Sequence, residues 1–404
     1  MAALLSSALL VGGCRGGGSE RDAQPLRDDL RAVLAQVAQL RGIQAPAGIE
    51  AGTTSREEVR ELLQETLTDT DRDTFRRLTD LYRLVGFIGP DDDYEELYLD
   101  FASRALIGFY HPARDTLWLV DGGDLAFNSF DATLRSTVAH EFVHALQDSK
   151  FDLPPLLERA SGDLDWSLAL SAVIEGDAVH YERLWAQEHL TSSDVSGTPV
   201  RGVTGGSIPA AIERELRWPY EGGLDWVSLL GKTGGNRMTD EVLGGSRITT
   251  AEILHPELRS SGWRPRDTQL PDLSPALGSG WRQVGGGTFG EFRLRNLLQL
   301  HVGGLPAVAA AAGWNGDRFA VYTEGERSVA VLFFEFIGAE GQEFHSAMTD
   351  WLRAAGAMMQ PESVGTLPDG RAVAVGRPAA GQGFLVFGSN REAVESVLTA
   401  LNGG

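Results

Sequence analysis

After its first 20 residues, the chain has a stretch in which apolar residues recur every three or four positions, the period of a helix with one buried face. Residues 21–42 show this pattern first, and it stops at Gly42, a residue type that often follows the last turn of a helix. Residues 45–54 are rich in proline, glycine and threonine, so we expect a linker there. The apolar positions of the first helix are Leu26, Leu30, Val33, Leu34, Val37 and Leu40.

Helical periodicity resumes at Ser55 and continues to about Leu84. Ser55 and Glu58 have the spacing of a capping box, in which each side chain binds the backbone N–H of the other residue. A Gly-Pro-Asp turn at 89–91 then opens another acidic helix that ends near Ala102. The N-terminal part of the chain is therefore expected to be mainly helical.

The middle of the chain begins with two short runs rich in aromatic and β-branched residues. These runs, 106–112 and 116–123, are separated by Ala-Arg-Asp and predict a β-hairpin. Asp131 then has the position of an N-cap for a helix over about 131–149. A second long helix is predicted from about Asp163 to Glu188.

The C-terminal part changes to alternating apolar and polar positions, the period of a half-buried strand. Before it, residues 196–210 are rich in glycine, serine, threonine and proline and predict a loop. Two units of strand, strand and helix follow, consistent with one sheet packed against two helices and without a catalytic triplet. Their predicted elements are a hairpin over 317–337, a helix over 341–356, a hairpin from 371–377 and 383–389, and a helix over 391–401.

Composition and charge narrow the possible partners. The chain has 404 residues, enough for more than one domain, and a net charge of −21. Such an excess of negative charge repels nucleic acids and anionic lipid surfaces, so neither is expected to be a partner. No segment approaches the roughly 20 uninterrupted apolar residues that a transmembrane helix needs.

The single cysteine, Cys14, closes the segment MAALLSSALLVGGC. This segment resembles the lipobox of a bacterial lipoprotein signal, which implies that Cys14 is lipidated and that residues 15–19 form a tether. We therefore expect an exported protein whose only membrane contact is a lipid anchor. Such signals require a Lys or Arg before the apolar run, and this sequence has none there. A true start that lies upstream would explain the departure. The alternative is a disordered N-terminus with a chance cysteine.

The strongest chemical motif is His140-Glu141-Phe142-Val143-His144 within the predicted helix. Residues four apart lie on the same face of a helix, so both imidazoles can bind one metal ion. A catalytic zinc site needs three protein ligands, an open position and a carboxylate that accepts a proton from water. Glu141 can serve as that carboxylate. The alternative is an ordinary amphipathic helix that carries two histidines.

A third ligand is required, and the next helix offers Glu175. Gln147 and Lys150 occupy the positions at which a longer zinc motif would place glycine and histidine, which excludes that pattern. A carboxylate among apolar residues is costly unless a cation compensates it. Asp148, one turn after His144, remains the next candidate. The neighbours of Glu175 are apolar or small: Leu168, Ala172, Val173, Ile174, Gly176 and Ala178.

The motifs HEFVH (140–144) and EGDA (175–178) together resemble the active site of the gluzincin metallopeptidases, the thermolysin- and aminopeptidase-like zincins. Their flanks, with WPYEGGLDWV (218–227) and TTAEILHPE (249–257), resemble a family of largely uncharacterised exported proteins regarded as metallopeptidases. The resemblance implies one Zn²⁺ per chain, held by His140, His144 and Glu175. It also implies that Glu141 is the general base and that the substrate is a peptide or protein.

The resemblance is incomplete around the ligands. Thermolysin-like enzymes carry an aspartate four residues after the ligand glutamate, where this chain has Val179. Asp177 or Asp148 is therefore expected to orient a ligand histidine. His255, before Pro256, is a further candidate, either as a donor to the oxyanion of the reaction or as a residue that caps a turn.

The sequence thus predicts an α+β protein with a mainly helical, zincin-like catalytic domain and a C-terminal α+β domain. The expected boundaries are 1–20 for the signal and tether, 21–104 for N-terminal helices packed on the catalytic domain, 105–260 for that domain and 261–404 for the last. The expected function is zinc-dependent peptide hydrolysis at the cell envelope. The alternative is a surface protein that keeps the scaffold without catalysis, but an intact Glu141 favours the enzyme.

Overall fold

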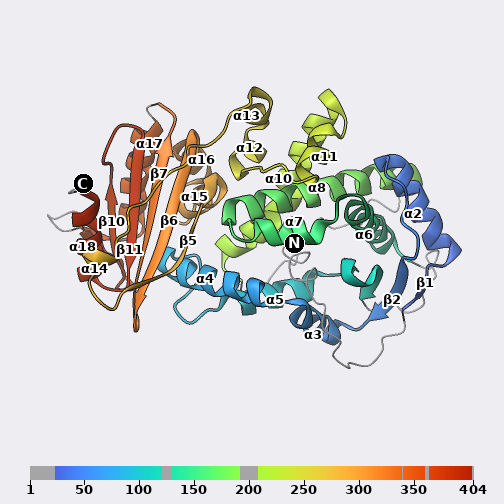
Figure 1. Ribbon diagram of the computed structural model, residues 1–404, viewed down its shortest axis with the longest axis horizontal. Helices are drawn as coiled ribbons and strands as arrows, with labels where there is room; N and C mark the ends of the chain where they lie inside the picture. Colours follow the sequence, from blue (N-terminus) through green and yellow to red (C-terminus); the bar gives the residue numbers. More distant parts are fainter. Residues whose placement is uncertain (1–22, 121–129, 192–207, 339, 360–363, 403–404) are drawn as a thin grey trace.

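The structure, a computed structural model, describes residues 23–120, 130–191, 208–338, 340–359 and 364–402 (Figure 1). Cys14 and most of the predicted loop at 196–210 lie outside these residues. Among the described helices, none is both long and apolar enough to cross a membrane. Helices and two separate sheets make up the described chain, which confirms an α+β fold.

The smaller sheet has four strands in the order β1-β2-β4-β3. Strand β2 pairs parallel to β4, and the other two pairings are antiparallel. The linker predicted at 45–54 is therefore wrong in its second half, because that half is strand β2. Its sequence, EAGTT, has no apolar run, and its Gly52 lies under Trp118, whose ring would be 2.4 Å from an added Cβ. The strands are β1 (Gln24–Pro25), β2 (Glu50–Thr54), β3 (Gly108–His111) and β4 (Thr116–Val120).

The N-terminal helices confirm the predicted periodicity, with one interruption. The run expected over 55–84 breaks at Leu67, because Thr68 and Asp71 form a second capping box after the one at Ser55 and Glu58. The helices are α2 (Asp28–Arg41), α3 (Arg56–Thr66), α4 (Asp69–Val85) and α5 (Tyr94–Ala105).

Two long helices of the middle region begin where the sequence predicts. The side chain of Asp131 caps α6 (Ala132–Phe151), and that of Asp163 caps α8 (Leu164–His189). The following elements are shorter, apart from α10. They are α7 (Leu153–Ala160), α10 (Ala210–Gly234), α11 (Arg237–Leu243), α12 (Thr250–Leu254), α13 (Pro256–Ser261), α14 (Ser274–Leu277), α15 (Gly290–Leu298) and α16 (Gly304–Ala311).

Helices α8 and α10 approach each other at two glycines. A Cβ on Gly176 would lie 2.1 Å from the carbonyl carbon of Gly223, and a Cβ on Gly223 would lie 1.8 Å from the carbonyl oxygen of Ala172. The two backbones can therefore touch only because neither residue has a side chain. This contact fixes α10 beside Glu175, the residue that precedes Gly176.

The C-terminal sheet has seven strands in the order β5-β6-β7-β11-β10-β9-β8 and contains both predicted units. Its two helices lie on opposite faces. Leu332 packs in one core with Trp351 of α17, and Val331 packs in another with Val394 of α18. The elements are β5 (Arg282–Gly287), β6 (Trp314–Glu324), β7 (Arg327–Phe336), α17 (Glu340–Ala354), β8 (Met358–Met359), β9 (Val364–Thr366), β10 (Ala372–Gly376), β11 (Gln382–Gly388) and α18 (Arg391–Asn402).

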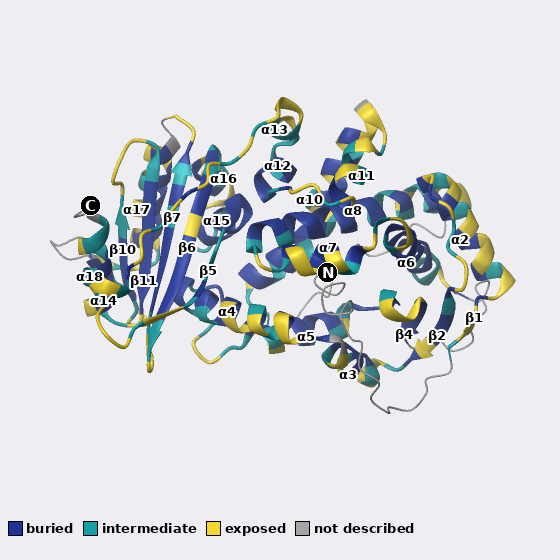
Figure 2. Ribbon diagram, in the orientation of Figure 1, coloured by how far each residue is buried: buried dark blue, intermediate teal, exposed yellow. Residues whose placement is uncertain are grey.

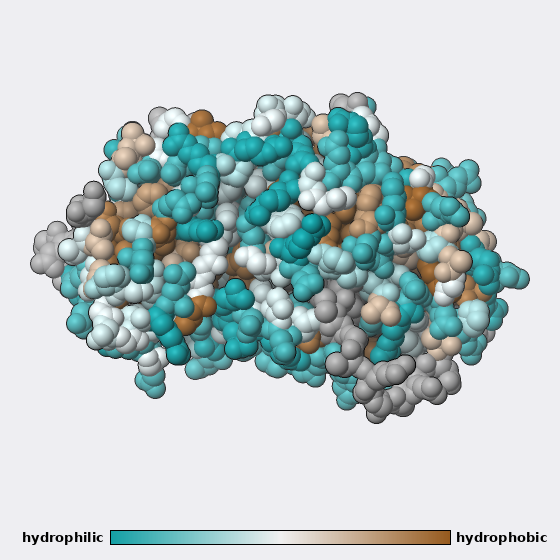
Figure 3. Space-filling model, in the orientation of Figure 1, coloured by the Kyte–Doolittle hydropathy of each residue, from teal (hydrophilic) through white to brown (hydrophobic). Residues whose placement is uncertain are grey.

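This sheet is joined to the rest of the molecule by a shared core. Helix α4 packs against β5, β7 and β11, and Arg371 donates to the carbonyl oxygens of Arg83 and Leu84 at the end of α4. Figure 2 shows buried residues running through the sheet and the central helices, and Figure 3 shows a mostly hydrophilic face with scattered apolar groups. The shared core thus joins the sheet to α4 and to the first part of α10.

Replacing Gly223 by alanine should separate α8 from α10, because the new methyl group would meet backbone that cannot move aside. We expect Gly223→Ala to lower the free energy of unfolding by about 1–3 kcal/mol, the usual cost of overpacking. Gly231→Ala on the same helix is the matched control, since an added Cβ there meets nothing within 4 Å. The control should gain about 0.5–1 kcal/mol from helix propensity in denaturant titrations. Equal stability of the two variants would contradict the close packing.

Candidate metal centre

His140, His144 and Glu175 converge at the centre of the α6–α8 pair. The two histidines lie one turn apart on α6, and their Nε2 atoms are 3.1 Å from each other. Oε2 of Glu175, on α8, is 3.3 Å from Nε2 of His140 and 3.6 Å from Nε2 of His144. All three ligand atoms lie within 4.8 Å of one another, a geometry that can hold a metal ion.

The carboxylate of Glu175 is the feature that most requires a cation. Its side chain is fully buried, and neither oxygen has a hydrogen-bond partner within the described residues. Burial of an ionised carboxylate without compensation is strongly unfavourable. Although burial raises its pKa, the positive charge of His144 holds the pKa of Glu175 well below its usual range. The residues present therefore fit a bound cation.

Hydrogen bonds at the far side of each imidazole fix which nitrogen faces the centre. Nδ1 of His140 lies 2.9 Å from Oε2 of Glu182, a carboxylate that can only accept. Nδ1 of His144 lies 2.9 Å from Oε1 of Gln147, a carbonyl oxygen that also accepts. Both Nδ1 atoms must then carry hydrogen, so in the neutral rings both Nε2 atoms present lone pairs to the same point.

These lone pairs repel each other unless a positive charge lies between them. In the absence of metal, a proton takes this place: although burial lowers it, the carboxylates of Glu175 and Glu141 raise the pKa of His144 to about 9. A metal ion satisfies three acceptors at once, whereas a proton satisfies at most two. The arrangement is therefore better matched to a metal ion.

Glu141 lies outside the ligand group and faces strand β3. Its Oε2 accepts a hydrogen bond of 3.0 Å from the backbone N–H of Tyr110. Val120 donates to the carbonyl oxygen of Ile107, and hydrogen-bonded pairs alternate along an antiparallel ladder. The N–H of Tyr110 therefore points away from β4, toward Glu141, and holds that carboxylate in place beside the ligands.

An aromatic side chain from α10 completes the surroundings. The ring of Tyr220 stacks on that of His140, with ring centres 6.2 Å apart and planes at 20°. Tyr220 stands one turn before Gly223, so the close contact between α8 and α10 places it. The sequence marked this segment only as similar to uncharacterised proteins.

The structure assigns the histidine-orienting positions differently from the sequence prediction. Neither Asp148 nor Asp177 touches an imidazole: Asp148 accepts from Leu153 N (3.2 Å) and Tyr110 Oη (3.5 Å). Asp177 is one contact further away, since it accepts from Gln147. Asp148 does not orient a ligand histidine, because its side chain turns to the end of α6, where it meets the start of α7.

His255 is not brought to the metal-binding group. Its Nε2 lies 2.9 Å from Oε1 of Glu291 and 3.1 Å from Nη2 of Arg295, both on α15. The hydrogen bond with Glu291 raises the pKa of His255, against a smaller effect of burial. His255 thus ties the junction of α12 and α13 to α15, and its expected role at the oxyanion stays a prediction.

Glu182 and Gln147 are the residues that sequence reasoning missed. Glu182 lies seven residues after Glu175, two turns along the same face of α8, and Gln147 lies three residues after His144. Helical spacing was therefore the available signal, because residues three, four and seven apart share a face.

Comparison with known proteins reaches only the C-terminal sheet. A family described as a domain of unknown function (DUF8575) matches residues 279–398, from just before β5 into α18. No curated protein matches the chain, and no solved structure matches it. The matched segment contains none of the residues of the metal-binding group, so the interpretation of that group depends on its geometry.

Removal of the third ligand should abolish tight metal binding. We expect Glu175→Ala to lower the affinity for a divalent metal by orders of magnitude, because two imidazoles alone leave the ion half coordinated. Glu182→Ala, which removes only an orienting contact, should lower affinity about 10–100-fold. Competition with a chromogenic chelator measures both. A full equivalent of tightly held metal in Glu175→Ala would show that the third ligand lies elsewhere.

Proposed function

We propose that the protein is a zinc-dependent peptidase, with zinc held by His140, His144 and Glu175. Two imidazoles and one carboxylate form a ligand set that favours zinc and leaves a coordination position open. The observation that carries the proposal is the buried carboxylate of Glu175, which has no hydrogen-bond partner among the described residues and faces two Nε2 atoms, with Glu141 fixed beside the group. A purely structural zinc site would have no use for that second carboxylate.

Zinc bound at this position would polarise a carbonyl group and make a water molecule more acidic. The role of Glu141 is to accept the proton of the attacking water and to deliver it to the leaving amine. Its carboxylate is only 4% exposed, so little solvent competes for that proton. The N–H of Tyr110 orients the carboxylate without neutralising it, because a backbone amide donates a hydrogen bond and keeps its proton.

Peptide as the substrate class is supported by the neighbouring strand. Strand β3 is the last strand of its sheet among the described residues, and it runs beside α6. An extended peptide can add to such an edge through its backbone, which fixes position while accepting different side chains. Residues Gly108–His111 are buried, so an incoming peptide would have to displace whatever covers them.

Substitution of the general base separates catalysis from metal binding. Glu141→Gln should keep about one equivalent of metal and lose about 10²–10⁴-fold in peptide hydrolysis, because an amide cannot accept the proton. Glu158→Gln, on the exposed side of α7, is the matched control and should behave as wild type. A generic peptidase assay with and without chelator provides the measurement. Normal turnover by Glu141→Gln would contradict the mechanism. Metal binding without hydrolysis, by the wild type and by both variants, would favour the non-catalytic scaffold.

We also propose that Cys14 is lipidated and anchors the protein at the cell envelope. Expressed from its natural start, the protein should sediment with membranes, and Cys14→Ser should move it to the soluble fraction. Stable anchoring usually takes two acyl chains, or one chain with a second membrane-binding signal. Identical fractionation of the two proteins would remove the anchor from the proposal.

A further inference from the structure

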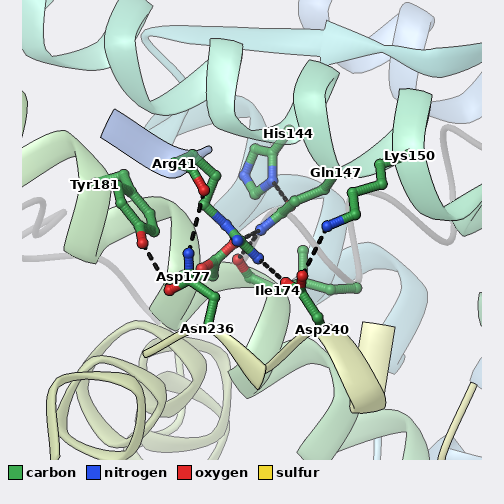
Figure 4. Close-up of polar contacts among 9 residues, drawn as sticks. All are labelled: Arg41, His144, Gln147, Lys150, Ile174, Asp177, Tyr181, Asn236 and Asp240. Atoms are coloured by element: carbon green, nitrogen blue, oxygen red, sulfur yellow. Dashed lines mark hydrogen bonds and ion pairs between the residues drawn. The ribbon is translucent and has the colours of Figure 1, made fainter. Parts of the chain in front are cut away.

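Arg41, the last residue of α2, is buried deep in the molecule although it is charged. It is 1% exposed, and it donates from Nε to Oδ2 of Asp177 (2.9 Å) and from Nη2 to Oδ1 of Asp240 (2.6 Å) (Figure 4). Its carbonyl oxygen accepts from the side-chain amide of Asn236, and its guanidinium carbon lies 5.4 Å from the ring centre of Tyr181. Arg41 therefore ties α2 to α8 and to the start of α11.

Such a buried pair contributes little net stability, because desolvation of both charges offsets their attraction. Asp177 is fully buried, and Arg41 is the cation that hydrogen-bonds it. The important consequence of Arg41 is therefore geometric, because the hydrogen bond from its Nε holds Oδ2 of Asp177 in a fixed place.

The position of Asp177 determines the orientation of Gln147. The Nε2 of Gln147 donates to Oδ2 of Asp177 (2.9 Å) and to the carbonyl oxygen of Ile174 (3.0 Å). Since both neighbours accept, the amide cannot flip, and its Oε1 must face Nδ1 of His144. Without the hydrogen bond from Arg41, the carboxylate of Asp177 could turn away, and the amide of Gln147 would lose one of the two acceptors that fix its orientation.

We propose that Arg41 is a positioning residue of the metal centre and that helix α2 is thereby part of that centre. Through Asp177 and Gln147, Arg41 keeps hydrogen on Nδ1 of His144 and leaves Nε2 free for the metal. Helix α2 also packs against both α6 and α8, so its docking and the geometry of the ligands change together. This inference rests on the metal site of the proposed function, but it does not require hydrolysis.

The outer end of the network supplies a contrast within the same cluster. Asp240 also accepts from Nζ of Lys150 (2.7 Å), and both side chains are partly exposed. In Figure 4, Lys150 makes a polar contact with Asp240 but with neither Asp177 nor Gln147. Loss of its charge should therefore leave the amide of Gln147, and with it the metal site, unchanged.

The first test compares two buried arginines. Arg41→Met should lower zinc affinity about 10–100-fold in chelator competition, and it should shift the ¹⁵N resonances of the His144 ring toward the other tautomer. Arg293→Met is the matched control, because Arg293 is also buried and pairs with Glu215 and Tyr82 instead of with residues of the metal centre. Arg293→Met and Lys150→Met should keep wild-type affinity within about twofold, as distant sites do. Wild-type affinity in Arg41→Met, or an equal loss in Arg293→Met, would overturn the inference.

The second test uses the wild-type protein and does not depend on how well a variant folds. Coupling between sites is reciprocal, so bound zinc should stabilise the docking of α2. Hydrogen exchange of the backbone amides near the end of α2 should slow about tenfold or more on zinc addition. The amides of α18, on the far face of the C-terminal sheet, should not change. Failure of the protein to bind zinc would refute the proposed function, whereas bound zinc with unchanged α2 exchange would refute only the role of Arg41.

Discussion

Three hydrogen-bond acceptors face one another in a buried space, and the surrounding structure holds them there. The Nε2 atoms of His140 and His144 and the carboxylate of Glu175 repel each other unless a cation lies between them. A fold stabilised by a small free-energy difference does not keep such an arrangement without compensation. The metal-binding interpretation follows from this electrostatic constraint, and the remaining features of the site can be understood as ways of maintaining it.

Each neighbouring helix contributes to that constraint in a different way. Helix α6 supplies both imidazoles and Glu141, and α8 supplies Glu175 with Glu182 behind His140. The glycine contact draws α10 close enough for Tyr220 to cover the ring of His140. Helix α2, through Arg41, holds the acceptor behind Gln147 in place. The C-terminal sheet contributes the core that it shares with α4.

Much of the fold was predictable because most of its elements have a simple hydrophobic period. The ends of α6 and α8, the two C-terminal units and the pair His140 and His144 follow from spacing along single helices or strands, whereas Glu175 was expected from its apolar surroundings and from a family resemblance. Strand β2 did not, because EAGTT becomes a strand only through its pairing with β4 and the cover of Trp118. A tertiary contact decided that element, which no local pattern could indicate.

The supporting residues of the site were harder to predict than its ligands. Arg41 and Asp177 are 136 positions apart, and no spacing rule links them. Gln147 stands where a longer zinc motif has glycine, so its role became visible only when its amide was seen between His144 and Asp177. His255 was considered for catalysis because of its local sequence, whereas the fold pairs it with Glu291.

The most direct test of this account is anomalous diffraction at the zinc absorption edge from crystals grown with zinc. The account predicts one strong peak, about 2.0–2.2 Å from Nε2 of His140, from Nε2 of His144 and from a carboxylate oxygen of Glu175. A structure in which these three side chains surround no metal, or in which zinc binds only elsewhere, would contradict it.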